Sequence, residues 1–137
     1  MAVNLVAERK VGDRFEGGSK VITRAELNTF CQITGMQLDA LLNDEAARAL
    51  GFKSRLVPGA FMFALAIGLL GELLDGHMHV AADNVKVRAP LYPGDSVKVE
   101  GSVLRKKETS KGDRIFVTWS WALKNQDDVT IAQGENT

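Results

Sequence analysis

The sequence predicts an α+β domain in which an antiparallel sheet surrounds one long apolar helix. Two observations predict this class. In the first half of the chain, apolar residues recur at helical spacing behind capping signals. In the second half, apolar and polar residues alternate with a period of two, which is typical of strands with one buried face. Helices followed by strands favour an α+β arrangement over alternating βαβ units.

The first two helices are predicted from their capping residues. Thr23 and Glu26 form a capping box, in which each side chain can bind the backbone N–H of the other residue. Asn43 can cap a second helix, which we expect to end at Gly51. In the first helix, apolar residues at helical spacing are followed by a glycine that can end it: Leu27, Phe30, Cys31 and Gly35.

The third helix is expected over Ala60–Leu74, after Pro58-Gly59 and before Asp75-Gly76. It is apolar on nearly every face, so we expect protein to surround it. It is shorter than the roughly 20 residues that a membrane span needs.

The strands are predicted from the period of two and from the turns between them. The expected strand residues are Val85, Val87 and Ala89, then Val97, Val99 and Val103, then Ile115, Val117, Trp119 and Trp121, and a last strand begins over Val129–Gln133. The expected connections are a turn at Pro90–Asp95, a hairpin loop at Lys106–Asp113 and a turn at Asn125–Asp128. Four or five antiparallel strands around one buried helix form the hot-dog architecture, here as a single domain over residues 1–137.

Composition excludes several classes of function. The 137 residues are 45% hydrophobic and 25% charged, as in an ordinary globular domain. Seventeen basic and 17 acidic residues give no net charge, which argues against a nucleic-acid binder. The single cysteine, Cys31, allows neither an internal disulfide nor a Cys-x-x-Cys metal pair. Because the first ten residues lack a signal pattern, we expect a cytoplasmic location.

Short motifs in a consistent order identify a family resemblance. They are Val11–Phe15, Ile33-Thr34-Gly35, Leu56-Val57-Pro58-Gly59, Gly68–Gly71, Pro93–Val97 and Gly134-Glu135. Through them the chain resembles the MaoC-like hydratase/dehydratase family of hot-dog proteins, which includes the (R)-specific enoyl-CoA hydratases. The resemblance implies an acyl thioester of coenzyme A or of an acyl carrier protein as ligand, with no other cofactor. It also implies a dimer or higher oligomer formed edge to edge.

The family's chemistry adds or removes water at an acyl thioester. The resemblance implies an aspartate and a histidine that share one water, and a backbone N–H at the start of the buried helix that polarises the thioester carbonyl. In the family, Thr-Gly is followed by Asp-x-Asn-Pro-x-His. Here Met36 stands in the place of the aspartate and Leu41 in that of the histidine. Neither side chain can transfer a proton.

The remaining pocket candidates follow from the same resemblance. Pro58 stands where the family has a histidine, and Ala64 stands where some members have a serine. Gly59 keeps the backbone N–H at the start of the helix, although it can equally be a simple helix-start glycine. The predicted substrate-binding residues are therefore Gly59, Met36, Leu41, Ala64 and Pro58.

Two residues are candidate replacements for the missing catalytic pair. Asp39 could be a displaced acid, or a polar residue in a loop between helices. His79 could be a replacement base, or a surface histidine. His77 and His79 lack a third strong ligand, with only Asp83 nearby, so no metal site is predicted.

Two basic groups could attract the phosphates of coenzyme A, or could simply be solvated surface. Lys53 and Arg55 lie just before Pro58-Gly59. The second group comprises Arg105, Lys106, Lys107 and Lys111.

Four functions remain open at this point. The first is a non-catalytic protein that binds an acyl thioester, either as a homodimer or in a heteromer with a catalytic homologue. The second is an active hydratase or dehydratase that uses Asp39 or His79. The third, an acyl-CoA thioesterase, is disfavoured because the helix around Ile67 is apolar. The fourth is a binding module without a thioester ligand.

Overall fold

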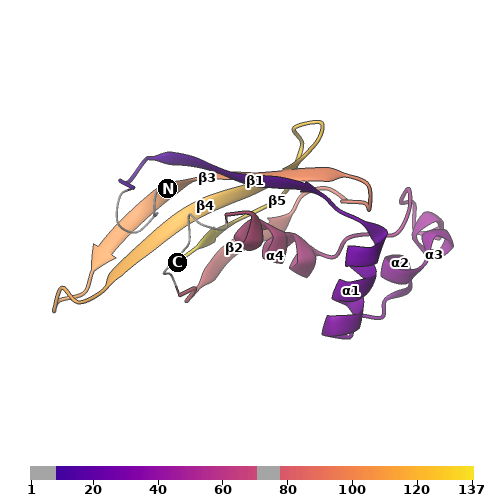
Figure 1. The fold of residues 1–137 in the computed structure, drawn as a ribbon, viewed down its shortest axis with the longest axis horizontal. Coiled ribbons are helices and arrows are strands. Elements are labelled where there is room, and N and C mark those ends of the chain that lie inside the picture. The colour runs from indigo at the N-terminus through magenta and orange to yellow at the C-terminus, as the bar shows by residue number, and fades with distance from the viewer. Residues whose placement is uncertain (1–8, 71–77) are drawn as a thin grey trace.

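The computed structural model describes residues 9–70 and 78–137. They form a five-stranded antiparallel sheet in the order β1-β3-β4-β5-β2, with helix α4 against one face (Figure 1). The strands are β1 (Arg14–Val21), β2 (Ala82–Val87), β3 (Ser96–Glu108), β4 (Ile115–Asn125) and β5 (Thr130–Asn136). The helices are α1 (Arg24–Thr34), α2 (Asp39–Leu42), α3 (Asp44–Ala49) and α4 (Gly59–Leu70). The predicted α+β hot-dog fold is confirmed.

The capping predictions are confirmed in detail. The Thr23 hydroxyl accepts from the backbone N–H of Glu26, and the Glu26 carboxylate accepts from that of Thr23. Gly35 ends α1 with a φ of 74°, which few residues other than glycine adopt. The Asn43 side chain caps α3 through the backbone N–H of Ala46.

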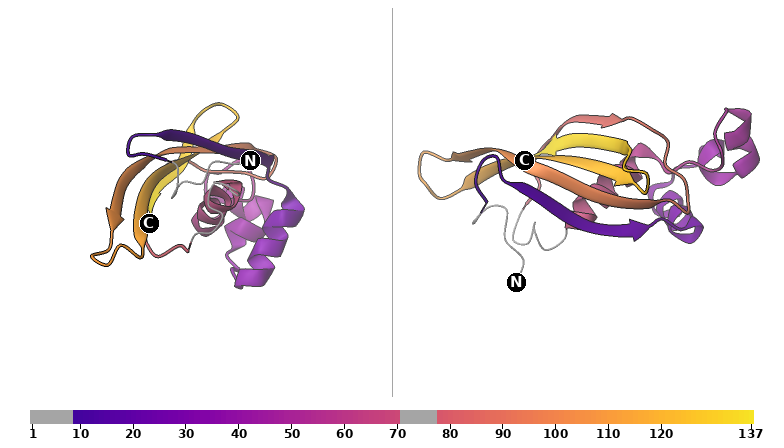
Figure 2. Two further views of the ribbon diagram at one scale, coloured as in Figure 1. Left: turned by 60° about the vertical axis from the view of Figure 1, so that its left-hand side comes forward. Right: turned by 90° about the horizontal axis from the view of Figure 1, so that it is seen from above.

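The main core lies between the concave face of the sheet and α4, which the sheet partly surrounds (Figure 2). Alternate residues of β3 and β4 point toward the helix, among them Val99, Val103, Trp119 and Trp121. A second, smaller core consists of Leu27, Cys31 and Leu41, with Met36 and Leu56 packed against it. Helices α1–α3 lie together near one end of the sheet.

Two elements are more exposed than the sequence predicts. Ala60, Ala64 and Gly68 form an exposed stripe along α4, so this chain alone does not surround the helix. Strand β2 is exposed along its whole length, and Val85 and Val87 are 44% and 55% exposed. Because β2 is an edge strand, nothing in the described chain covers its outer side.

The boundaries also differ from those predicted. The expected loop at Lys106–Asp113 is shorter, because β3 continues to Glu108 and pairs there with Ile115. Ile115 is 42% exposed rather than buried with the tryptophans. Gly134 and Glu135 lie inside β5. The predicted end of the third helix and His77 lie outside the described residues.

Candidate functional site

The start of α4 presents backbone donors without partners in the helix. The N–H groups of Phe61 and Met62 both donate to the carbonyl of Pro58, at 2.9 and 3.1 Å. The N–H groups of Gly59 and Ala60 lie in the first turn, where an α-helix offers them no backbone acceptor. The helix dipole places partial positive charge at this end. The site can therefore bind a carbonyl oxygen that gains negative charge.

Gly59 also sits close to strand β2. A side chain at this position would bring its Cβ within 2.9 Å of Val87 Cγ2, so α4 and the end of β2 approach closely here. Exposed Ala64 lies one turn further along the helix, on the same stripe as Ala60. The start of α4 and the end of β2 thus share one surface.

Met36 and Leu41 lie together in the smaller core, as neighbours of Leu27 and Cys31. Leu41 is only 5% exposed. The segment is tied to the connection that precedes α4, because the N–H of Leu56 donates to the carbonyl of Ala40 at 3.0 Å. Met36 and Leu41 therefore contribute to the same small apolar core.

Arg55 has a structural position that sequence reasoning missed. It is 7% exposed, and its Nε donates to the carbonyl of Leu41 at 2.8 Å. Its Nη2 donates to Asn28 Oδ1 at 2.5 Å. The guanidinium thus joins α1 to α2 and is not presented to solvent as a phosphate-binding group would be. Its partners are 14 and 27 residues away in sequence, which no local pattern reveals.

Lys53 and the two replacement candidates are exposed. The backbone N–H of Lys53 donates to the Tyr92 hydroxyl at 3.3 Å, and its side chain remains exposed. Asp39 begins α2. His79 Nε2 lies 2.9 Å from the carbonyl oxygen of Ala81, and its ring centroid is 5.8 Å from that of Phe63, one turn from Gly59. His79 is therefore near α4, whereas no contact in the described chain joins it to Asp39.

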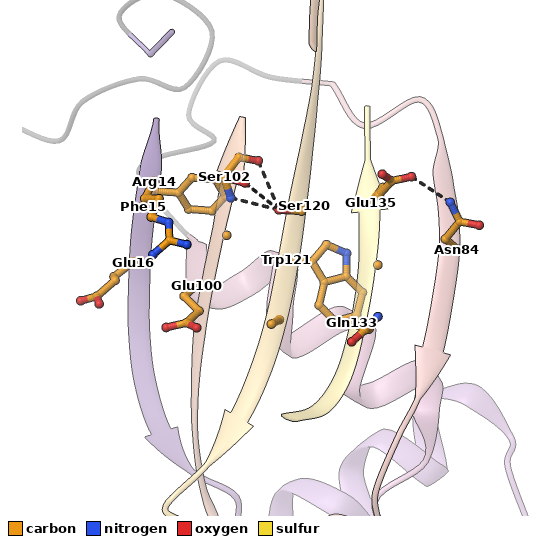
Figure 3. Close-up of a pocket in the computed structure, with 13 residues that line it drawn as sticks. Arg14, Phe15, Glu16, Asn84, Glu100, Ser102, Ser120, Trp121, Gln133 and Glu135 are labelled. Carbon is orange, nitrogen blue, oxygen red and sulfur yellow. Dashed lines mark hydrogen bonds between the residues drawn. The ribbon is translucent and has the colours of Figure 1, made fainter. Parts of the chain in front are cut away.

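A groove of about 510 Å³ lies on the opposite, convex face of the sheet (Figure 3). Its polar lining alternates with the core residues: Arg14, Glu16, Glu100, Ser102, Ser120 and Glu135 point outward. The two serine hydroxyls lie 3.1 Å apart, and Asn84 Nδ2 donates to Glu135 Oε2 at 2.9 Å. The groove contains none of the predicted site residues.

Across residues 9–70 and 78–137, no three His, Cys, Asp or Glu side chains gather as metal ligands would. None of the helices described is long and apolar enough to span a bilayer.

Comparison with known proteins then decides the family. Residues 9–134 match the model of the FAS1-like dehydratase domain region. The chain belongs to this dehydratase family. It is 23% identical, over 93% of its length and 75% of the relative's, to the mitochondrial 3-hydroxyacyl-[acyl-carrier-protein] dehydratase of Arabidopsis thaliana.

Solved structures agree with the hot-dog fold of the dehydratase family. The MaoC-like dehydratase of Rhodospirillum rubrum superposes with a TM-score of 0.81, at 24% identity over 93% of this chain and 89% of that one. A chain of the HadBC 3R-hydroxyacyl-ACP dehydratase complex of Mycobacterium tuberculosis gives 0.79, at 18% identity over 92% and 93%. The resemblance to MaoC-like hydratases and dehydratases is confirmed.

Proposed function

We propose that this dehydratase-family protein binds an acyl thioester without catalysing hydration by itself, and serves as the non-catalytic partner in an oligomer. The observation that carries the proposal is the packing of Met36 and Leu41 in the smaller core. General acid–base groups are each worth about 10²–10⁴-fold in rate, so the loss of both removes most of the activity. The partner would be a homologue that retains the aspartate and histidine.

The binding half of the proposal rests on the start of α4. The N–H of Gly59 is a donor at the positive end of a helix, which suits the carbonyl oxygen of a thioester. Gly59 carries no side chain that would obstruct this approach.

The oligomer half rests on the uncovered surfaces. The exposed stripe of α4 and the exposed strand β2 border one another near Gly59 and Val87. Pairing through the β2 edge would cover Val85 and Val87 and satisfy the free strand edge. The similar HadBC chain belongs to a complex, which supports a heteromeric arrangement.

Binding is tested by thermal unfolding with crotonyl-CoA. At about 100 times its dissociation constant, a ligand of the folded state stabilises it by about 2.7 kcal/mol. We expect this shift in the native chain and about tenfold weaker binding in Gly59→Ala, because the new methyl group lies beside the N–H and presses on Val87 Cγ2 at 2.9 Å. Gly18→Ala is the matched control, since a Cβ there meets only ordinary contacts. The absence of a shift with any acyl-CoA would leave a binding module without a thioester ligand.

One observation keeps an active hydratase as the second candidate. His79 lies beside Phe63, one turn from Gly59, where an imidazole could approach a bound thioester. If His79 is the base, His79→Gln abolishes turnover of crotonyl-CoA while leaving the thermal shift intact. Equal turnover in His79→Gln and in the native chain excludes an active hydratase that uses His79.

A further inference from the structure

The β3–β4 hairpin extends beyond the other strands of the sheet (Figures 1 and 2). Pairing of β3 with β1 ends at Ser102, and pairing of β4 with β5 ends at Trp119. From Arg105 to Thr118 the two strands pair with each other alone among the described strands. We call residues 105–116 the hairpin tip.

The hairpin tip is strongly basic in a chain without net charge. It contains five basic residues and two acidic ones, so it carries three positive charges while the rest of the chain carries three negative ones. In the described part of the chain, the exposed side chains of Arg105, Lys107, Lys111 and Arg114 form no ion pair. Asp113 is engaged by the Thr109 hydroxyl at 2.7 Å. The positive charge of the hairpin tip can therefore attract an anionic partner.

The basic side chains are interleaved with exposed apolar ones. Phe116 and Ile115 are 40% and 42% exposed. Lys107 lies opposite Phe116, and Arg105 lies opposite Thr118, so these two cations share one face of the ribbon with the phenylalanine. Aromatic and arginine side chains are enriched where proteins bind each other. The combination fits an acidic protein surface with an apolar patch better than a free nucleotide, which needs a pocket.

The position of the hairpin tip relates it to the thioester site of a second copy. Strand β2 begins at Ala82, which pairs with Asn136 beside Trp119, and therefore starts at the hairpin end of the sheet. It ends at Val87, against Gly59. Two copies that pair symmetrically through β2 run antiparallel, because a two-fold axis reverses the strand direction. The hairpin end of one copy then lies on the same side as the start of α4 in the other.

We propose that the hairpin tip is the docking surface for an acidic acyl carrier protein that presents its acyl chain to the second copy. This inference rests on the proposed thioester function and names the carrier. Charge complementarity carries it: the carrier's acidic face would meet Arg105 and Lys107, and Phe116 would contact its apolar patch. A carrier-bound thioester needs such a surface, whereas a coenzyme A thioester does not.

The test compares two forms of one acyl group, crotonyl carrier protein and crotonyl-CoA, by calorimetric titration at low and moderate salt. Arg105→Glu/Lys107→Glu is expected to weaken carrier binding about tenfold and to leave crotonyl-CoA binding unchanged. The native affinity for the carrier falls as salt rises. Phe116→Ser weakens carrier binding without altering this salt dependence. Arg48→Glu reverses a charge at an exposed position of α3, outside every ion pair of the described residues and remote from the hairpin, and is the control.

Three results overturn the inference: no carrier binding by the native chain, unchanged binding in Arg105→Glu/Lys107→Glu, or equal losses for carrier and coenzyme A. The third result would mean that the reversal disturbs the thioester site or the fold. Failure of the proposed function gives a different pattern, because crotonyl-CoA would then not bind the native chain. Carrier binding that requires Arg105 and Lys107 in that case supports docking and rejects the thioester site at α4.

Discussion

Asp44 ties the start of α3 to two other parts of the chain. Its Oδ1 accepts from the backbone N–H of Arg55 at 3.0 Å, and its Oδ2 lies 3.0 Å from the Arg24 guanidinium. The Arg55 hydrogen bond, followed by that of Arg24, lowers the pKa of the Asp44 carboxyl from its usual 3.8. The lowered pKa means that the ionised carboxylate favours the folded state.

This favourable contribution is present above the ordinary pKa and is lost as the pH falls through the lowered one. We therefore expect Asp44→Asn to have a lower free energy of unfolding at neutral pH. Between about pH 5 and about pH 1, its free energy of unfolding should also fall less steeply than that of the native chain. Chemical unfolding across that range measures the effect. Asp127→Asn, at an exposed position outside every ion pair of the described residues, is the control. The same pH dependence of the unfolding free energy in the two variants would contradict this role of Asp44.

Arg55 is buried and hydrogen-bonded, whereas Lys53, two residues away, is exposed. Arg55→Met leaves the Leu41 carbonyl and the Asn28 amide without their buried donor, so we expect a loss of about 2–4 kcal/mol in unfolding free energy. Lys53→Met leaves stability within about 0.5 kcal/mol, since the side chain is exposed. Denaturant unfolding measures both. If Arg55→Met unfolds like the native chain but binds crotonyl-CoA weakly, Arg55 holds the ligand instead.

At the scale of elements, β4 and β5 share a buried polar contact. Trp121 Nε1 donates to Asn136 Oδ1 at 3.3 Å, and Asn136 Nδ2 is buried without a partner. Trp121→Phe removes the contact and leaves the whole amide unsatisfied, so it should cost about 1–3 kcal/mol more than its loss of volume alone. Trp119→Phe, on the same face of β4, provides that volume reference. Equal costs in thermal unfolding would show that the hydrogen bond contributes nothing.

Local signals were sufficient to predict some elements but not their surroundings. The capping box at Thr23 and the glycine that ends α1 depend on neighbours within a turn, and both are where the sequence places them. The alternation at Val85 and Val87 predicts a strand, but not that it is an edge strand with both valines exposed. What covers a strand or a helix depends on residues far away in sequence or on another chain.

In the candidate site, too, local signals predict some residues, whereas others depend on contacts between distant parts of the chain. Gly59 could be predicted because Pro58-Gly59 before an apolar run marks a helix start. The joint packing of Met36 and Leu41 with Cys31 could not, because it depends on how α1 and α2 fold against each other. The role of Arg55 was missed for the same reason.

For the whole molecule, the uncovered β2 edge and the α4 stripe predict a stable oligomer. Val85→Lys/Val87→Lys places two charges on the exposed edge strand, and charged edges prevent strand pairing. We expect this variant to be monomeric by light scattering at concentrations where the native chain is not. Val129→Lys, at a position 45% exposed in the β4–β5 connection, is the control. A native chain that is itself monomeric would contradict the predicted oligomer.

The most direct measurement of the central claim is the hydration of crotonyl-CoA by the purified chain alone, at concentrations that saturate its binding. With Leu41 buried in the smaller core and Met36 packed against it, we predict that the protein with bound crotonyl-CoA turns over no faster than the reaction without enzyme. Activity should appear only after addition of a homologue that carries the aspartate and histidine. Turnover by the isolated chain at the roughly 1–10³ s⁻¹ of ordinary enzymes would contradict it.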